Sequence, residues 1–315
     1  MTDRTLSRRE IILGAGALLG AAALPRTAAS QERPRDEPFG YCLNTGTISG
    51  FKLPLPQVID LVAEAGYQAI EPWIGNLDQF VKGGGSLKDI EKRLRDRGIT
   101  VESAVGFPEW IVDDDARRAK GMETMKRDMD FVAQIGGKRI AAPPAGAYDT
   151  PAIEVARVAE RYRAVCELGD RMGVVPQVEF WGGAKNNLRQ LAQALAVAAG
   201  SGHPRACILP DIYHMYKGES DLDGLKNLGS VKAHVLHAND YPADPPREKI
   251  GDGHRVYPGD GVAPIARILR DLHASGFRGF LSLELFNREY WKTDAPTVAR
   301  TGIEKMRAAV RKAFA

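Results

Sequence analysis

The chain has 315 residues, of which 44% are hydrophobic and 26% are charged, and its formal net charge is +3. These proportions are ordinary for a globular protein and exclude a fibrous repeat or a wholly disordered chain. Three cysteines without a C-x-x-C spacing exclude a disulfide framework, and we expect all three to be buried as small apolar residues.

The first 29 residues predict an export signal. Arg8 and Arg9 precede an apolar stretch from Ile11 to Leu24, and small residues lead to a cleavage point expected after Ala29. The paired arginines resemble a twin-arginine signal, which predicts export by the twin-arginine machinery to the periplasm or another extracytoplasmic compartment. A Sec signal and an uncleaved anchor are the alternatives. The apolar stretch is too short to span a bilayer comfortably, so no stable membrane insertion is expected.

Removal of this signal changes the electrostatic argument. It takes away four arginines and two acidic residues, which lowers the formal charge from +3 to +1. A nearly neutral protein has no electrostatic basis for binding nucleic acid or an anionic membrane. Residues 30–37 then predict a polar linker, and residues 38–315 a single domain.

That domain alternates regularly between apolar runs and amphipathic patterns. The apolar runs predict strands at 38–47, 67–73, 99–107, 137–143, 174–181, 206–213, 231–238 and 279–286. The patterns between them predict helices at 54–66, 86–98, 114–136, 150–173, 187–200, 220–228, 261–276 and 294–314. Five glycines at helix ends predict left-handed C-caps: Gly66, Gly98, Gly136, Gly173 and Gly276. Eight strand–helix units predict one (β/α)8 TIM barrel of the α/β class, with an open doubly wound sheet as the alternative.

Four polar residues close the last four predicted strands: Glu179, Asp211, His237 and Glu284. In a parallel barrel these strand ends lie at one face, where active sites of this architecture are found. Three carboxylates and one imidazole form a donor set for a divalent cation. Burying the carboxylates there without a compensating charge would be costly. The pattern therefore predicts a metal-dependent enzyme, with four separate structural roles as the alternative.

Further side chains are expected around this site. Glu71 occupies an inward position of the second strand and predicts either a contact with a substrate hydroxyl or a supporting group behind the metal ligands. A hydrogen-bonded barrel residue is the alternative. Trp181, together with Trp73 and Phe286, predicts an apolar wall for a sugar ring, and plain packing is the alternative.

The order Glu, Asp-x-x-His, His, Glu on the last four strands resembles the xylose isomerase-like barrel superfamily over residues 38–314. Supporting motifs are Asn44-Thr45-Gly46-Thr47, Ala69-Ile70-Glu71-Pro72-Trp73 and Pro258-Gly259-Asp260-Gly261. The resemblance implies that the four strand-end residues bind one divalent metal ion, with Mn²⁺ expected first, then Mg²⁺ or Co²⁺, and Zn²⁺ less so. It also implies that Glu179 and Glu284 form an acid–base pair.

The resemblance implies substrate contacts as well. His214 matches a histidine that binds a substrate oxygen, and Arg255 matches a substrate-binding arginine. The loop between His237 and Arg255 is longer than in the family, so Arg247 and a lid or subunit contact are alternatives, the last implying a homo-oligomer. Lys185 stands where ketose 3-epimerases have a second glutamate, so their usual substrate contacts are not transferred.

The leading interpretation is a metal-dependent isomerase or epimerase that moves a proton next to a carbonyl of a free sugar or sugar derivative. Sugar phosphates are cytoplasmic, which argues against them as substrates of an exported enzyme. One alternative is a dehydratase or lyase acting on an inosose or a 3-keto-glycoside with the same groups. Another is a non-catalytic, exported sugar-binding barrel. The abasic endonucleases of the superfamily, whose sites lie in a basic groove, are excluded because the early strands lack their histidines and the exported chain has a formal charge near zero.

Overall fold

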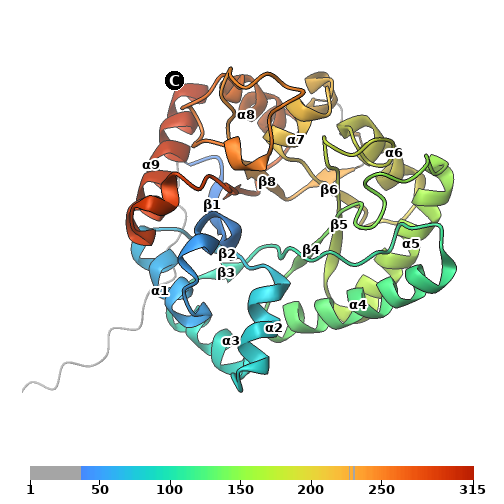
Figure 1. Ribbon diagram of the computed structural model, residues 1–315, viewed down its shortest axis with the longest axis horizontal. Helices are drawn as coiled ribbons and strands as arrows, with labels where there is room; N and C mark the ends of the chain where they lie inside the picture. The colour runs from blue at the N-terminus through green and yellow to red at the C-terminus, as the bar shows by residue number, and fades with distance from the viewer. Residues whose placement is uncertain (1–36, 227, 230) are drawn as a thin grey trace, which may run out of the picture.

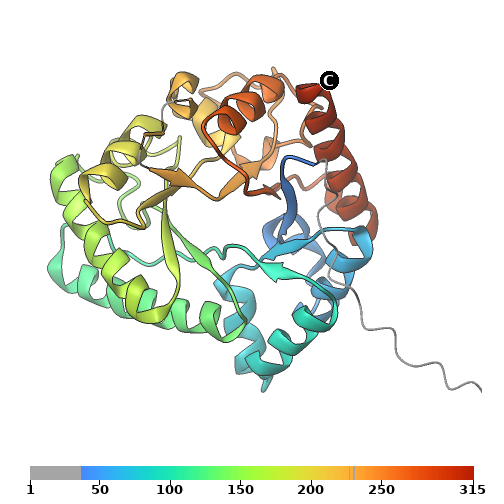
Figure 2. The same ribbon diagram turned by 180° about the vertical axis from the view of Figure 1, so that it is seen from behind.

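The computed structural model describes residues 37–226, 228–229 and 231–315 (Figures 1 and 2). The predicted export signal and residues 30–36 of the predicted linker lie outside these residues. In the described part of the chain, no helix is both long and apolar enough to cross a membrane.

Short strands alternate with helices along the described chain. The strands are β1 (Gly40–Asn44), β2 (Ala69–Glu71), β3 (Thr100–Val101), β4 (Arg139–Ala142), β5 (Val175–Glu179), β6 (Cys207–Leu209), β7 (Lys232–Ala233), β8 (Val235–Ala238) and β9 (Phe280–Leu283). The α-helices are α1 (Leu55–Ala65), α2 (Ile74–Lys82), α3 (Leu87–Asp96), α4 (Asp115–Gln134), α5 (Val155–Met172), α6 (Leu191–Gly200), α7 (Ile212–Lys217), α8 (Ile265–Ala274) and α9 (Ala295–Phe314). The 3-10 helices are η1 (Thr45–Phe51), η2 (Leu222–Leu225), η3 (Asp252–His254) and η4 (Tyr290–Lys292).

The strands form a parallel TIM barrel, as predicted. One group of strands is hydrogen-bonded in the order β3-β2-β1-β9-β8 and the other in the order β4-β5-β6-β7. His234 interrupts what is otherwise one strand, so that β7 pairs with β6 while β8 pairs with β9. On the other side, the backbone N–H of Ala141 donates to the carbonyl of Ala104 at 2.8 Å and joins β4 to the segment after β3.

The helices surround the strands in chain order, and α9 packs against both α8 and α1 (Figure 1). The last helix of the chain therefore lies beside the first, which is the arrangement of a barrel and not of an open sheet. All five predicted glycine caps have positive φ angles, from 67° at Gly98 to 91° at Gly66 and Gly276. The glycine prediction is confirmed because this conformation strains any residue with a Cβ.

The elements predicted around the sixth strand differ from the observed ones. The strand predicted at 206–213 ends at Leu209, and the helix α7 begins at Ile212. Asp211 causes this early turn, because its side chain caps the helix by accepting a hydrogen bond from the backbone N–H of His214. The helix predicted at 220–228 is only the turn η2. The helix α2 was not predicted.

The barrel interior carries an apolar layer beneath its polar mouth. Ala141, Leu209 and Val235 form a buried cluster of their own inside the barrel. Asp211 and His237 lie two residues beyond Leu209 and Val235, and the alternation of strand side chains directs them to the same side. The three cysteines are buried and unpaired, as predicted.

Candidate active site

The imidazole of His237 lies at the centre of the site and is fully buried. Its Nε2 atom lies 3.0 Å from Oε2 of Glu71. Its Nδ1 atom lies 3.1 Å from Oε2 of Glu284, 3.5 Å from Oδ2 of Asp211 and 3.7 Å from Oε1 of Glu179. None of these three contacts has the geometry of a hydrogen bond, so Nδ1 has no hydrogen-bond partner in the part of the chain that the structure describes. The ring therefore presents one nitrogen to three carboxylate oxygens.

Three of these four residues form a group that could hold a divalent cation. The ligand atoms of Asp211, His237 and Glu284 lie within 4.8 Å of one another. Glu179 is not part of this close group, although its Oε1 atom lies 3.7 Å from His237 Nδ1, and its Oε2 atom is buried without a hydrogen-bond partner among the described residues. Three oxygens and one imidazole nitrogen suit Mn²⁺, Mg²⁺, Co²⁺ or Zn²⁺. The predicted strand-end residues thus converge on Nδ1 of His237.

Glu71 supports His237 from behind. Its Oε2 atom accepts hydrogen bonds from His237 Nε2, from Asn44 Nδ2 at 3.0 Å and from Ser282 Oγ at 2.6 Å. A carboxylate behind a metal-binding histidine fixes the orientation of the ring and makes its other nitrogen a better ligand. Because the Glu71 carboxylate is fully buried behind the ring, its position favours the supporting role over a contact with substrate.

Asn44 and Ser282 belong to this support but were not assigned from the sequence. Asn44 also donates to Oε1 of Glu284 at 3.1 Å and accepts from Nε1 of Trp73 at 2.9 Å. Ser282 precedes Glu284 by two residues on the same side of the last strand. The sequence did contain a hint of both residues, since each occupies an inward position close to the end of a predicted strand.

Arg255 is the arginine that reaches the site. Its Nη1 atom lies 2.8 Å from both Asp211 Oδ2 and Glu284 Oε2, and its side chain is 1% exposed. Its Nη2 atom donates to Asp252 Oδ1 at 2.5 Å, a further contact that the sequence did not predict. Arg247, the alternative, instead pairs with Glu219 at 2.7 Å outside the site.

His214 lies beside Arg255 in the first turn of α7. Its Nε2 atom is 3.2 Å from Arg255 Nη2, and its Nδ1 atom accepts a hydrogen bond from the backbone N–H of Gly182 at 3.3 Å. Asn239 donates to both oxygens of Asp211 at 3.3 Å. The start of α7 therefore fixes Asp211 and places His214 at the wall of the pocket.

The charges of the site compensate one another. Burial raises the pKa of Glu179 to about 8; His237 opposes this rise, and Glu284 and Asp211 add to it. Although burial opposes it, the guanidinium of Arg255 holds the pKa of Asp211 well below its usual range. The carboxylates of Glu284 and Glu71 raise the pKa of His237 despite burial. Carboxylates that need this much positive charge form a favourable site for a cation.

A cavity of about 480 Å³ opens above these residues. Glu179, His214, Arg255 and Glu284 line it, as does Trp181. The other two predicted wall residues, Trp73 and Phe286, also line it, with their ring centroids 5.8 Å apart. The aromatic residues are therefore in contact with the pocket, as the sequence predicted.

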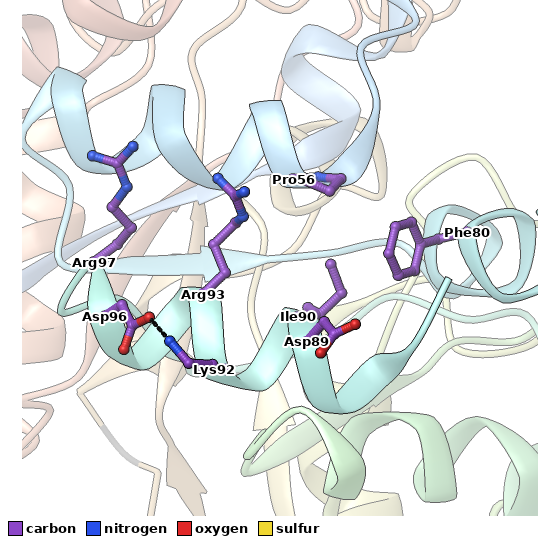
Figure 3. A pocket seen from close by; sticks show the side chains of 8 residues that line it. All are labelled: Pro56, Phe80, Asp89, Ile90, Lys92, Arg93, Asp96 and Arg97. Atoms are coloured by element: carbon purple, nitrogen blue, oxygen red, sulfur yellow. Dashed lines mark hydrogen bonds and ion pairs between the residues drawn. The ribbon is translucent and has the colours of Figure 1, made fainter. Parts of the chain in front are cut away.

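A second cavity of about 380 Å³ lies in the helical layer between α1 and α3 (Figure 3). Two arginines point into it, but Arg93 and Arg97 both pair with Asp60, at 2.6 and 2.8 Å. Lys92 pairs with Asp96 at 2.5 Å. The cations of this cavity are thus neutralised by protein carboxylates, and the pocket at the strand ends is the candidate site.

Comparison with known proteins places the chain in a family. The model of the xylose isomerase-like TIM barrel family matches residues 59–309. The chain belongs to this family. A fructoselysine 3-epimerase of Escherichia coli O157:H7 is 26% identical over 82% of this chain and 94% of its own length. An inosose isomerase of Bacillus velezensis is 25% identical over 82% of this chain and 93% of its own.

More distant family members broaden the chemistry. A 3-dehydroshikimate dehydratase of Pseudomonas aeruginosa is 25% identical over 74% of this chain and 36% of its own length. The crystal structure of the IOLI protein with a bound zinc atom superposes with a TM-score of 0.77 at 22% identity, covering 88% of this chain and 99% of that one. The structure comparison confirms the barrel. The relatives by sequence include an epimerase, an isomerase and a dehydratase, which supports an enzyme of these classes.

Proposed function

We propose that the protein is a metal-dependent isomerase or epimerase that moves a proton next to a carbonyl of a free sugar or sugar derivative. One observation carries this proposal: three carboxylates converge on Nδ1 of His237, whose Nε2 is held by Glu71. An epimerase and an isomerase among the relatives support it.

Glu179 and Glu284 are the proposed acid–base pair. The carboxylate of one removes the proton from the carbon next to the carbonyl, which leaves an enediolate. The carboxylic acid of the other returns a proton to that carbon from the opposite face in epimerisation, or a proton is delivered to the neighbouring carbon in isomerisation. Both glutamates line the pocket.

The other residues position the substrate and the ion. Glu179, Asp211, His237 and Glu284 would hold the cation, for which we propose Mn²⁺. When bound, a divalent cation supplies Lewis-acid stabilisation of the negative charge that develops on the carbonyl oxygen. Arg255 and His214 reach the same part of the pocket and are proposed to bind substrate oxygens.

A second candidate is elimination by the same groups. If a hydroxyl or glycosidic oxygen lies β to the acidified carbon, the electron pair expels it, and the acid protonates it as water or an alcohol. The related 3-dehydroshikimate dehydratase favours keeping this candidate. We also propose export of the protein by the twin-arginine route, on the basis of Arg8 and Arg9 and the apolar stretch that follows.

The test is exchange of carbon-bound hydrogen in D₂O, with Mn²⁺-loaded protein and free ketoses, inososes and 3-keto-glycosides as substrates. Deuterium in a product of otherwise unchanged composition is the expected result. Loss of water or of an alcohol would replace the isomerase with the lyase. If the wild-type protein binds sugar but shows neither hydrogen exchange nor product, the protein is a non-catalytic sugar-binding barrel. Glu179→Gln and Glu284→Gln are each expected to lower turnover about 10²–10⁴-fold while the fold is retained.

A further inference from the structure

The mouth of the barrel is divided into two halves. The four candidate metal ligands lie at the ends of β5, β6, β8 and β9. Aromatic residues follow the ends of β9, β2, β3, β4 and β5 in that order: Phe286, Trp73, Phe107, Tyr148 and Trp181. All five line the 480 Å³ cavity, and we refer to them as the aromatic arc.

The rings of the arc form a continuous wall. The ring centroids of Trp73 lie 5.8 Å from Phe286 and 5.3 Å from Phe107. The ring of Trp181 lies 6.1 Å from Phe107 and 6.3 Å from Tyr148. These distances are typical of aromatic pairs in contact. The wall therefore leads from the metal centre to the open end of the cavity.

The inner and outer members of the arc differ in their surroundings. Phe286 lies 5.1 Å from the guanidinium of Arg255, and Trp73 is hydrogen-bonded to Asn44, so both adjoin the metal centre. Phe107 and Tyr148 are 46% and 43% exposed. Large exposed aromatic rings that converge on one cavity indicate a binding surface.

The outer ring of Tyr148 lies against Gly183. A Cβ atom at Gly183 would lie 2.1 Å from the Tyr148 hydroxyl oxygen, so the ring would have to shift if another residue replaced this glycine. The backbone N–H of Lys185 donates to the carbonyl of Tyr148 at 2.9 Å and fixes the same two segments. Phe107 is fixed on the other side of Trp181 by its edge-on contact with Trp73.

The charges of the pocket favour a neutral occupant for the outer rings. Among the described residues that line the cavity, the charged ones follow β5, β6, β8 and β9, which form the metal half. Lys217 is one of them, but its ammonium donates to the carbonyls of Arg247, Glu248 and Ile250, which uses all three of its N–H groups. A cavity of about 480 Å³ lies in the range that encloses drug-sized ligands, which are larger than a single sugar ring.

We propose that Phe107 and Tyr148 form a subsite for the neutral, aromatic aglycone of a glycoside substrate. The keto sugar of that glycoside would occupy the metal half, and its aglycone would lie against the two outer rings beside Trp181. Only the placement of the keto sugar in the metal half rests on the proposed function. The outer subsite binds an aromatic ring whether or not the sugar reacts.

The test is a comparison of two unreactive probes, phenyl and methyl β-D-glucoside, by calorimetry on the Mn²⁺-loaded protein. Phenyl glucoside is expected to bind at least tenfold more tightly. Phe107→Ala and Tyr148→Ala should each reduce this ratio of affinities about 2- to 12-fold, which corresponds to one aromatic contact. Phe314→Ala is the matched control, since Phe314 is 41% exposed and lies outside the cavity lining.

Gly183→Ala provides a second variant, because it displaces the ring of Tyr148 without removing an aromatic side chain, and it should lower the same ratio. Equal binding of the two glucosides by the wild-type protein, or a ratio unchanged in all three variants, would overturn the proposal. The proposed function fails separately, if no keto sugar or keto-glycoside exchanges hydrogen or forms product while phenyl glucoside still binds preferentially.

Discussion

Replacing Glu71 with glutamine tests whether His237 is a supported metal ligand. The change removes the negative charge that faces Nε2 of His237 and leaves the volume of the side chain almost unaltered. An amide oxygen can retain the three hydrogen bonds that Oε2 now accepts. Its NH₂ group, however, would take the place of Oε1, which has no hydrogen-bond partner among the described residues. The variant should therefore hold the imidazole less firmly and weaken Nδ1 as a ligand.

The expected loss follows from the position of the carboxylate. Removing the group behind a metal-binding histidine typically costs 10- to 100-fold in metal affinity, or about 1.4–2.7 kcal/mol. The Kd for Mn²⁺ should rise by this factor, measured by calorimetry on chelator-treated protein. Turnover at saturating Mn²⁺ should fall less, because Glu179 and Glu284 are unchanged.

Glu102→Gln is the matched control for this experiment. Glu102 is 3% exposed and pairs with Lys138 at 2.5 Å and Arg139 at 3.2 Å, away from the metal ligands. Its substitution also removes a buried negative charge and should leave Mn²⁺ affinity unchanged. Wild-type affinity in Glu71→Gln would refute the reasoning about His237. An equal loss in both variants would show a general effect of buried charge.

Three further predictions concern the ion, pH and the loop before Arg255. Mn²⁺ at about 100 times its Kd should stabilise the fold by about 2.7 kcal/mol and raise Tm by roughly 4–5 °C, and an unchanged Tm would exclude a site in the folded protein. Burial, reinforced by Arg139 and Lys232, lowers the pKa of His234 from 6.5 to about 4, so the unfolded chain takes up a proton first as the pH falls. Stability should therefore be lost between these values, and melting at pH 7.5 and 5.0 should show a smaller loss for His234→Gln. Lys217→Met removes the three hydrogen bonds that the ammonium donates to loop carbonyls. It should raise KM more than it lowers kcat and speed proteolysis between residues 243 and 252. An unchanged KM and an unchanged rate of proteolysis would show that the lysine does not position the loop.

The barrel and the convergence of the candidate metal ligands could be predicted because both depend on local patterns. Alternation within each strand places Glu179, Asp211, His237 and Glu284 inward, and parallel strands bring their ends together. No knowledge of long-range pairing is needed for that step, only the expectation that the strands close in chain order. His237 is the clearest case, since its position relative to Val235 already directs it into the barrel.

The support behind the ligands could not be predicted in the same way. The hydrogen bond from Asn44 to Glu284 joins residues 240 positions apart, and that from Ser282 to Glu71 joins residues 211 apart. These contacts depend on the register of β1 against both β2 and β9. The choice between Arg247 and Arg255 likewise depends on the path of a loop.

The helix α7 shows a different limit of sequence reasoning. It has six residues, too few for a helical pattern to stand out, and its start is set by the capping of Asp211. The same carboxylate that ends the strand as a candidate ligand therefore also starts the helix that carries His214. From the sequence alone, Asp211 is therefore predicted as the end of a strand, because its capping hydrogen bond is visible only in the structure.

In the proposed mechanism, the two halves of the mouth have separate roles in the outcome of the reaction. An enediolate formed by Glu179 or Glu284 would have two possible fates: reprotonation gives an isomer, and expulsion of a β-oxygen gives elimination. The glutamates cannot decide between these outcomes, because both begin with the same proton transfer. What decides is whether a leaving group stands perpendicular to the plane of the enediolate, and that depends on how the rest of the substrate lies against the aromatic arc. Substitutions of Phe107 and Tyr148 should therefore alter the ratio of products, whereas substitutions of Glu179 and Glu284 should suppress both reactions together.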